Sequence, residues 1–510
     1  MRLLDRQHIL AQEVGTRYGH KARSLAMVYP SPYNVGMSSL GFQSLYRQIN
    51  DENSGWTAER AFLPEGDETQ GLSTLETGRA VAEHDAIGVS VAYELEIFGL
   101  LRVLQLSGLQ PLAKDRRERD PPVILGGPLT FSNPLPAAPF GDVILLGECE
   151  ELLPQALAVF AVHDKRTALE ILSGWAHVLV PAIHGEMLPQ VAACANSMVP
   201  ARSCIITPNA ELSDMFLIEA ERGCHRNCTF CVMRRSTNGG MRLVSVERIL
   251  ELIPAHARKV GLVGAAVSDH PHIVPLLRAL VDERGLRVGI SSLRADRLTD
   301  EFVRLLAKGG YRTLTVASDA PSQRLRDSLE KKIKEKHLLA AAHLAHTHKL
   351  SLLKSYMMIG VPDERDEDID ELIRFTRELS AVHPVSIGLA PFVPKYNTPL
   401  AEADFAGPEL VEARLTRLRA GLKGKADVRA TSVKEAEVEA MLATAGFAAA
   451  EMVIASQKDG FGWKHFYRYA RKHGAPARRT QHFVDPYPPR RHKLEPLLGT
   501  PAPSGAINIS

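Results

Sequence analysis

Two successive runs of short apolar segments, each segment followed by a helix-like pattern, constrain the fold of this 510-residue chain more than any other feature. Strands that alternate with helices are typical of α/β units in which the strands form a parallel sheet. By length alone, the chain has room for about three domains. The pattern therefore predicts two α/β units, flanked by smaller segments.

The first run, residues 24–165, predicts a flavodoxin-like, doubly wound parallel sheet. Gly126 and Gly127 directly follow one of its strands, and a polar turn at residues 147–150 reads GlyGluCysGlu. Ligands of such sheets lie beyond the carboxyl ends of the strands, where these turns fall. The predicted strands are residues 24–29, 57–63, 86–92, 122–125 and 142–146.

The second run, residues 214–400, predicts six strands that alternate with helices. Six such units match a partial (β/α)6 barrel of the TIM type rather than a complete eightfold one. Barrel enzymes place their chemistry on the loops after the strands. The predicted strands are residues 215–220, 259–266, 287–291, 313–317, 351–358 and 385–390, and the helices between them are residues 246–257, 272–283, 300–308, 335–348 and 367–380.

Four smaller segments complete the predicted organisation. Residues 1–23 form an N-terminal extension, residues 166–213 a connector, and residues 401–474 a small, mostly helical C-terminal region. Residues 475–510 are rich in proline and basic residues, which predicts a poorly structured tail. Basic and aromatic residues alternate near this end, a pattern also used in RNA binding. Nucleic-acid binding is an alternative there, but a solvated terminus is favoured.

The balance of charges excludes a strong electrostatic field around the whole molecule. The 61 Lys and Arg residues nearly balance the 59 Asp and Glu residues, which leaves a formal charge of +2. Recruitment of nucleic acid or of an anionic membrane by the whole molecule is therefore not indicated. We find no secretory signal and no apolar stretch of the roughly 18 to 20 residues that a membrane span needs. Six cysteines are too few for a disulfide framework in a chain of this length. We expect a cytoplasmic protein.

Three of the six cysteines lie within eight positions, in the sequence GluArgGlyCysHisArgAsnCysThrPheCys at residues 221–231. Cluster ligands are thiolates that must converge from a tight loop. Cys224, Cys228 and Cys231 would leave one iron of a [4Fe–4S] cluster without a protein ligand, and a molecule with an amine and a carboxylate can chelate that iron. The loop follows the first strand of the predicted barrel, where barrel enzymes carry their chemistry.

Two other sites compete with this interpretation. A structural zinc site would need a histidine such as His225 as fourth ligand, but zinc sites usually consist of two spaced pairs. An electron-transfer cluster normally has a fourth cysteine nearby, whereas Cys204 lies twenty residues upstream of Cys224. The position of the loop in the barrel favours the open cluster over both.

The motif CysXXXCysXXCys after the first strand of a partial barrel resembles the radical S-adenosylmethionine (SAM) superfamily. Further blocks resemble the subgroup that joins an N-terminal cobalamin-binding-like domain to a radical SAM core. The resemblance covers most of residues 25–400. The blocks are TyrProSerProTyrAsnValGlyMetSerSerLeuGlyPheGln at 29–43, the segment 124–150, ArgLeuArgAsp at 324–327, LysSerTyrMetMetIleGlyValPro at 354–362 and PheValProLysTyrAsnThrPro at 392–399.

The resemblance implies a mechanism and a set of ligands. In the superfamily the open iron binds the amino and carboxylate groups of SAM, and one electron cleaves SAM into methionine and a 5′-deoxyadenosyl radical. A low-potential flavodoxin or ferredoxin supplies that electron. Cys224, Cys228 and Cys231 match the cluster ligands, and Phe230 matches the aromatic residue that flanks the adenine.

The remaining SAM contacts are expected at the ends of the later strands. Gly264 lies where the family approaches the SAM amino group, although the customary acidic residue is missing there and Asp269 is the nearest substitute. Ser291, Ser292 and Arg294 follow the third strand. Asp319 and Arg324 could hold the two charged ends of the methionine part, or form a surface ion pair. Ile359 belongs to the block that resembles the adenine-binding strand, or to an ordinary strand end.

Cobalamin is an open alternative for the first unit. Many cobalamin domains carry an AspXHisXXGly motif whose histidine binds cobalt, and the corresponding turn here reads TyrAsnValGlyMetSerSerLeuGly at residues 33–41. Absence of the histidine does not exclude the cofactor. The turns at Gly126, Gly127 and Gly147 fit the approach of a flat cofactor, and they fit equally a sheet that has lost its ligand.

The predicted activity is radical modification of an unactivated C–H position, with methyl transfer as the leading subtype if cobalamin binds. Two alternatives stay open. A methylthiotransferase-like RNA-modifying enzyme would need a second cluster, for which Cys149, Cys194 and Cys204 are the candidates, but buried structural thiols are favoured. A non-catalytic iron–sulfur or zinc scaffold would bind metal without cleaving SAM. The substrate is unknown at this stage, because fold-level resemblance does not define it.

Overall fold

The computed structural model of the protein describes residues 3–52, 54–66, 71–233, 240–458 and 460–479. Its first unit is a six-stranded sheet in which β1 to β5 run parallel in the order β2-β1-β3-β4-β5. This order is that of flavodoxin-like folds and confirms the predicted fold class. The strands are β1 Arg23–Tyr29, β2 Trp56–Phe62, β3 Ala86–Ser90, β4 Val123–Gly126, β5 Val143–Leu145 and β6 Val178–Leu179.

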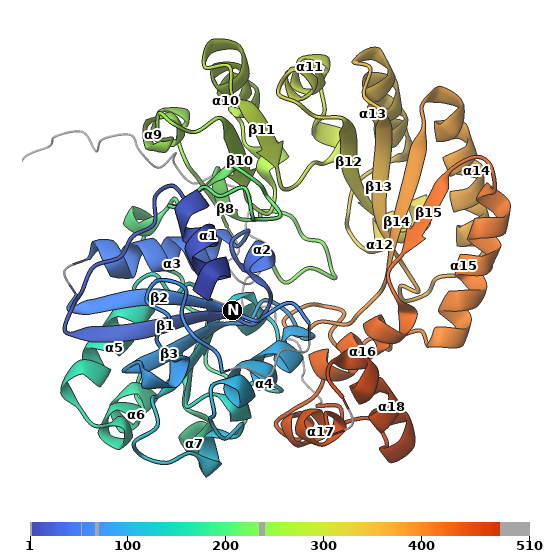
Figure 1. Ribbon diagram of the computed structural model, residues 1–510. Coiled ribbons are helices and arrows are strands. Elements are labelled where there is room, and N and C mark those ends of the chain that lie inside the picture. Colours follow the sequence, from blue (N-terminus) through green and yellow to red (C-terminus); the bar gives the residue numbers. More distant parts are fainter. Residues whose placement is uncertain (1–2, 53, 67–70, 234–239, 459, 480–510) are drawn as a thin grey trace, which may run out of the picture.

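Helices cover both faces of this sheet (Figure 1). Successive side chains of a strand point to opposite faces, and β1 shows this directly. Ala26 and Val28 pack in one apolar cluster with α4, whereas Leu25 and Met27 pack in another with α3 and α5. The helices of the unit are α1 Leu3–Gln12, α2 Tyr33–Gly36, α3 Leu40–Asp51, α4 Glu96–Leu106, α5 Leu152–Val162, α6 Lys165–Ser173 and α7 Pro181–His184.

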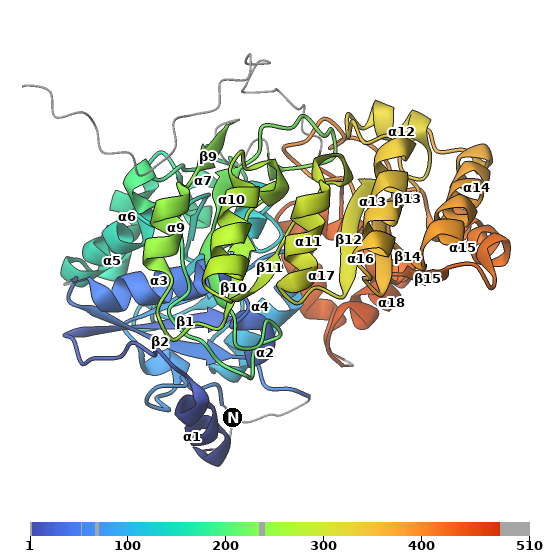
Figure 2. The ribbon, with the colours of Figure 1, turned by 90° about the horizontal axis from the view of Figure 1, so that it is seen from above.

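The second unit is a curved row of parallel strands with helices on its outer side (Figure 2). Its sheets have the orders β11-β10-β7 and β12-β13-β14-β15, and within the described residues no strand pairing joins β11 to β12. The barrel is therefore partial, as predicted. All six expected strands occur. They are β7 Phe216–Glu219, β10 Lys259–Val263, β11 Arg287–Ile290, β12 Thr313–Asp319, β13 Leu352–Ile359 and β14 Val385–Pro391.

The helices of this unit share one large apolar core with the strands. They are α9 Val246–Leu252, α10 Ile273–Arg278, α11 Asp300–Lys308, α12 Gln323–Ser328, α13 Glu335–Thr347, α14 Asp366–Val382 and α15 Pro408–Leu422. Residues Ala279–Glu283 extend α10 by a π-helical turn. A small antiparallel pair, β8 Glu221–Gly223 and β9 Met241–Leu243, lies next to this core and brackets the cysteine loop.

Two of the smaller segments also contribute strands. β6 pairs antiparallel with β5, so the segment 166–213, which connects the units, adds an edge strand to the first sheet. The segment 401–474 contributes β15 Asp427–Ala430, which pairs parallel with β14. The rest of that segment is helical, with α16 Val433–Ala443, α17 Ala448–Ser456 and α18 Trp463–His473.

The helices α16 to α18 pack against the first unit, and α16 also contacts β14 and α15 of the barrel. Phe466 of α18 contacts Phe98 of α4, with ring centroids 5.7 Å apart, and both belong to one apolar cluster of the first unit. Of the predicted tail, residues 480–510 lie outside the described part of the chain. Within that part, no helix combines the length and apolar character that a membrane span requires.

Candidate functional site

The cysteine loop leaves β8 and returns through β9, directly after β7. Gly223 begins the turn with φ of +93°, a conformation that favours glycine. Thr229 donates its backbone N–H to the carbonyl oxygen of Leu329 at 3.2 Å, and Cys231 donates to the carbonyl oxygen of Cys228 at the same distance. The loop is thus fixed to the segment that follows α12.

The three thiols lie on one short loop, as the ligands of an iron–sulfur cluster do. All three are half-buried, and burial raises the pKa of each thiol, for Cys224 to about 12. A metal that binds them must therefore displace their protons.

An arginine of the loop anchors it to the barrel. Arg226 donates to both carboxylate oxygens of Asp269, at 2.8 and 2.6 Å, and Arg297 donates to the same carboxylate at 2.8 Å. Burial opposes the charge of Asp269, but the hydrogen bonds from Arg226 and Arg297 outweigh it and lower the pKa of that carboxyl. Asp269, the expected substitute for a ligand-binding acid, is therefore committed to holding the loop.

Two of the predicted charged residues come together near Cys228. Asp319, at the end of β12, forms an ion pair with Lys331, and Arg294 donates to the carbonyl oxygen of Lys331 at 3.0 Å. The charges of Lys331, Asp319 and Arg294 all influence the pKa of the Cys228 thiol, although burial dominates it. Sequence reasoning missed Lys331, because nothing distinguishes it from the lysines at positions 332, 334 and 336.

Arg324 lies elsewhere. Its guanidinium forms an ion pair with Asp368 of α14 and donates to the carbonyl oxygen of Asp363, and its side chain is 44% exposed. It forms no ion pair with Asp319, whose partner is Lys331. The structure therefore does not bring Asp319 and Arg324 together, neither around a ligand nor as an ion pair with each other.

Gly264, Ser291 and Ser292 form one hydrogen-bonded turn beyond β10 and β11. The Ser291 hydroxyl accepts from the Gly264 N–H at 3.1 Å and donates to the Gly264 carbonyl oxygen at 2.9 Å. The Ser292 hydroxyl accepts from the Val267 N–H at 3.0 Å. The hydroxyl groups therefore shape the turn around Gly264.

The two apolar candidates lie in different layers. Phe230 packs against a small cluster that includes Leu329, Val361 and Phe392, next to the cysteine loop. Ile359 is fully buried in the core that β13 shares with the outer helices. The side chain of Ile359 therefore points away from the inner face of the barrel, and only its backbone is placed to meet a ligand there.

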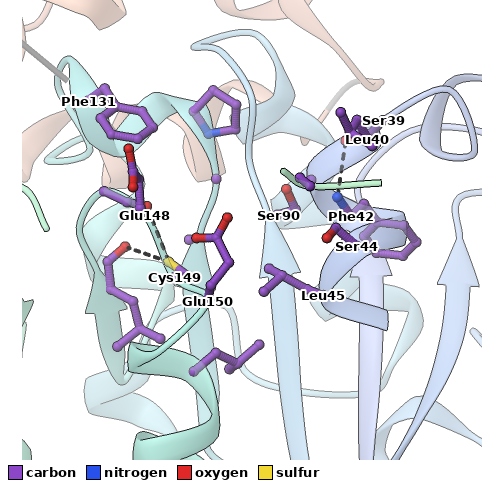
Figure 3. A pocket seen from close by; sticks show the side chains of 18 of the residues that line it. Ser39, Leu40, Phe42, Ser44, Leu45, Ser90, Phe131, Glu148, Cys149 and Glu150 are labelled. Atoms are coloured by element: carbon purple, nitrogen blue, oxygen red, sulfur yellow. Dashed lines mark hydrogen bonds between the residues drawn. The ribbon is translucent and has the colours of Figure 1, made fainter. Parts of the chain in front are cut away.

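A cavity of about 550 Å³ lies between the two units. Its walls come from the carboxyl ends of β3 and β4, from α3 and the turn before α5, and from the start of the cysteine loop with the end of β10. Figure 3 shows Glu148, Cys149 and Glu150 on one wall and Ser39, Leu40 and Ser44 on the opposite one. Cavities of this size, largely apolar with a few polar groups, are typical ligand sites.

A buried ion-pair network joins the two units at the edge of the cavity. Arg222 contacts Glu219 at 2.8 Å, Glu150 at 2.7 Å and Glu148 at 3.3 Å, and Arg242 also pairs with Glu148. Among the described residues, Glu148, Glu150 and Cys194 have donor atoms close enough to bind one metal ion. The arginines already neutralise these carboxylates, so the network is structural.

The thiols outside the loop do not form a second cluster site. Cys149 and Cys204 pack with one apolar cluster of the first unit, whereas the sulfur of Cys194 contacts Arg222 at 3.2 Å and belongs to the barrel core. Burial raises the pKa of Cys149 and of Cys204 to about 12, which keeps both protonated.

Known proteins share this chain's sequence patterns. The family described as "Radical SAM proteins, N-terminal" matches residues 41–181, and the "Radical SAM superfamily" matches residues 218–376. "Uncharacterized protein MJ0966" of Methanocaldococcus jannaschii is 28% identical over 400 residues, 75% of this chain and 80% of that protein. "Uncharacterized methyltransferase PH0819" of Pyrococcus horikoshii is 25% identical over 169 residues, 32% of this chain and 37% of that protein.

A solved structure is also similar to this chain. The cobalamin-dependent S-adenosylmethionine radical enzyme OxsB, with aqua-cobalamin and S-adenosylmethionine bound, superposes with a TM-score of 0.48 at 14% identity, over 79% of this chain and 56% of that one. The two family matches cover both units described above and imply a [4Fe–4S] cluster and SAM. The chain is a member of the radical SAM superfamily.

Proposed function

We propose that this radical SAM enzyme methylates an unactivated carbon of its substrate, with a [4Fe–4S] cluster at the cysteine loop and a corrinoid in the cavity between the units. The position of that cavity carries the proposal. Strand ends of the flavodoxin-like sheet line one side, and Gly223, Gly264 and Ala265 line the other. A cofactor in this cavity lies beside the loop that holds the iron ligands.

The residues of this chain bind and orient the reacting groups. When bound, the cluster supplies the electron that cleaves SAM into methionine and a 5′-deoxyadenosyl radical, and a corrinoid carries the methyl group. Cys224, Cys228 and Cys231 hold the irons, and the contacts of Arg226 and Asp269 fix the loop. The apolar side chains on the cavity walls exclude water from a radical reaction. A low-potential flavodoxin or ferredoxin supplies the electron.

The glycines of the cavity wall would suit a flat cofactor. Gly126 and Gly127 present no side chains there, so a cofactor can approach the backbone closely. No histidine is among the described residues that line the cavity. The Cys149 thiol also lines it, and burial raises the pKa of that thiol to about 12. The lack of a histidine among the described lining residues agrees with the missing AspXHisXXGly motif.

Two further observations bear on the reaction type. The name of the relative PH0819 gives it as a methyltransferase, which supports methyl transfer here. A methylthiolating reaction would need a second cluster, and Cys149, Cys194 and Cys204 do not lie together in one site. We therefore favour methylation over methylthiolation.

The first experiment tests the radical chemistry. The protein is reconstituted anaerobically with iron and sulfide, reduced with dithionite and incubated with SAM, and 5′-deoxyadenosine is assayed. We expect about four irons per chain and 5′-deoxyadenosine, as one cluster requires. Replacing Cys224, Cys228 or Cys231 singly with Ala abolishes both. The matched control is Cys204→Ala, outside the loop. Iron binding without SAM cleavage would support the non-catalytic scaffold, and zinc in place of iron would contradict the cluster.

The second experiment tests the corrinoid. Protein purified with hydroxocobalamin should carry a corrinoid absorption spectrum. Gly126→Phe places a ring in the cavity without backbone strain, because its Cβ would meet Cys149 Sγ at an ordinary 3.7 Å. We expect this variant to lose the corrinoid and keep its irons. Gly19→Ala, outside the cavity lining and with open space around the added methyl group, is the control. A wild-type protein that stays colourless under these conditions contradicts the proposed cofactor.

A further inference from the structure

Four glutamates line the cavity where it meets the cysteine loop, and one of them differs from the rest. Glu148, Glu150 and Glu219 are paired with Arg222. Glu221 is fully buried and forms no ion pair within the described residues. Its Oε1 atom accepts from the Ala266 N–H at 2.7 Å, and its Oε2 atom is buried without a hydrogen-bond partner in that part of the chain.

Burial of a carboxyl group in this position is unfavourable in free energy. Burial, together with the negative charges of Glu219 and Asp269, raises the pKa of Glu221 to about 8, although the backbone N–H groups of Ala266 and Ala265 act to lower it. Buried polar groups in native proteins nearly always have partners, so an unpartnered carboxyl oxygen needs an explanation. A cationic ligand in the cavity would supply one, because it provides the missing donor and charge.

The surroundings of Glu221 are shaped around its carboxyl group. A Cβ atom on Gly264 would lie 2.2 Å from Glu221 Oε1, so only glycine leaves room for the carboxyl group at the end of β10. Both residues line the cavity. Glu221 also lies three positions before Cys224 and influences the pKa of its thiol.

The other acids near the loop are already paired. Asp269 accepts hydrogen bonds from Arg226 and Arg297, and Asp319 pairs with Lys331. Within the described residues around the cysteine loop, Glu221 is the carboxyl group left without a cation.

We propose that Glu221 receives the α-ammonium group of SAM, in place of the acidic residue that the strand end at Gly264 lacks. The ammonium donates to the free carboxylate oxygen, while the other oxygen keeps its hydrogen bond to Ala266. Glu221 is thereby a positioning residue that orients the methionine part of SAM toward the open iron. The inference rests on the use of SAM by this chain and is independent of a corrinoid in the cavity.

The test separates the charge from the shape of the side chain. Glu221→Gln keeps the size and the acceptor for the Ala266 N–H but loses the charge. Binding of SAM to the reconstituted protein is measured by calorimetry and by the change that SAM causes in the EPR spectrum of the reduced cluster. The same measurements use a SAM analogue that lacks only the amino group. We expect SAM to bind about tenfold more weakly or worse to the variant, and the analogue to bind both proteins equally.

The matched control is Glu96→Gln. Glu96 is also buried, also accepts from a backbone N–H, that of Ala92 at 2.6 Å, and does not line the cavity. We expect its variant to bind both ligands as the wild type does. Iron content is measured for each variant, and only proteins with about four irons per chain are compared.

Two results would overturn the assignment of Glu221: an unchanged affinity of the Gln variant for SAM, or an equal loss for SAM and for the amine-free analogue. If the Gln variant fails to hold a cluster, Glu221→Asp takes its place, and a weakening confined to SAM is then the supporting result. A wild-type protein with a full cluster that binds no SAM would overturn the use of SAM itself, which is a separate failure.

Discussion

Arg222 links the two units of the molecule through one side chain. Its guanidinium, 10% exposed, contacts Glu219 of β7 and, in the first unit, Glu148 and Glu150 in the turn before α5. The same residue lies two positions before Cys224. The start of the cysteine loop therefore contacts a turn of the other unit through Arg222.

Removal of this cation leaves the three carboxylates without their shared partner. Breaking a buried ion pair from one side costs about 3–5 kcal/mol, because the remaining charges are uncompensated. We expect Arg222→Met to lower the melting temperature and to reduce the iron content after reconstitution. Arg248→Met, which removes an exposed pair with Glu251, is the control and should change neither quantity. An Arg222→Met protein that matches the wild type in both would show that the network does not support the loop.

The burial of His270 predicts that the folded protein loses stability at acidic pH. His270 is 2% exposed, its Nε2 lies 2.9 Å from the Val244 carbonyl oxygen, and its Nδ1 accepts from the His272 N–H. Burial lowers the pKa of this histidine below its usual 6.5. The folded protein therefore binds this proton less readily than the unfolded chain, and the stability is present above pH 6.5 and decreases as the pH falls below it.

The measurement is the melting temperature between pH 7 and pH 5. We expect a steeper decrease on acidification for the wild type than for His270→Asn, in which the titrating group is absent. His256→Asn, at an exposed position, should retain the wild-type dependence. Identical curves for wild type and His270→Asn would contradict the prediction.

For single residues, the sequence predicts arrangements that lie within one short segment. The spacing of Cys224, Cys228 and Cys231 predicts the iron ligands, because a cluster site needs its thiols on one short loop. The partners of charged residues could not be predicted. Arg226 and Asp269 are 43 residues apart, and Glu221 and Ala266 are 45 apart. Only the folded strand ends bring such residues together.

Most strands of the two units were predictable from apolar patterns within short segments, and β15 is an exception. β1, β10 and β14 are apolar and buried over most of their length, which is what a strand in a parallel sheet covered on both faces requires. β15 consists of Asp427, Val428, Arg429 and Ala430 at half-exposed or exposed positions. Four such residues have no apolar run, so the pairing of β15 with β14 decides its conformation.

The turn after β4 shows how one position fixes an element. Gly127 has φ of +101°, and a Cβ atom there would lie 2.6 Å from the Val91 carbonyl oxygen and 2.8 Å from its nitrogen. Backbone atoms cannot move aside as a side-chain end can. Gly127→Ala should therefore combine backbone strain with overlap, each of which costs about 1–3 kcal/mol.

Gly108→Ala is the matched control for this prediction. Gly108 also has a positive φ, of +71°, but nothing lies within 4 Å of an added Cβ atom. Thermal unfolding should show a larger destabilisation for Gly127→Ala than for Gly108→Ala. Equal destabilisation of the two variants would mean that the backbone near Val91 shifts without any loss of stability.

For the molecule as a whole, the C-terminal segment joins the two units. Lys395 follows β14 of the barrel and pairs with Glu94 of the first unit and Glu439 of α16, at 2.6 and 2.7 Å. The apolar cluster around α4 includes residues of α16 to α18. These helices therefore complete the core of the first unit, although they come last among the helices in the sequence (Figure 1). Amino-acid patterns within one segment do not predict packing against a distant segment.

The last described residues extend this connection. Arg478 donates to Asp404 at 2.7 Å and to the carbonyl oxygens of Ala401 and Ala403. The hydroxyl group of Tyr396, a residue that is 1% exposed, donates to the carbonyl oxygens of Thr444 and Arg479. The segment 475–479 thus binds to the structured part of the chain, so the tail predicted for residues 475–510 does not begin at residue 475.

Two truncations test where the structured chain ends. A chain that stops after Arg479 keeps every contact of Arg478 and Tyr396, so we expect its melting temperature to equal that of the full chain. A chain that stops after Gly474 loses these contacts and leaves the hydroxyl group of Tyr396 with the Thr444 carbonyl oxygen as its acceptor. Hydrogen bonds and an exposed ion pair contribute about 1 kcal/mol each, which corresponds to a melting temperature lower by a few degrees.

Arg478→Ala in the full chain should reproduce part of the decrease in melting temperature. If both truncated chains melt together with the full chain, residues 475–479 contribute nothing to stability; if both melt lower by the same amount, the stabilising contacts come from residues 480–510 instead.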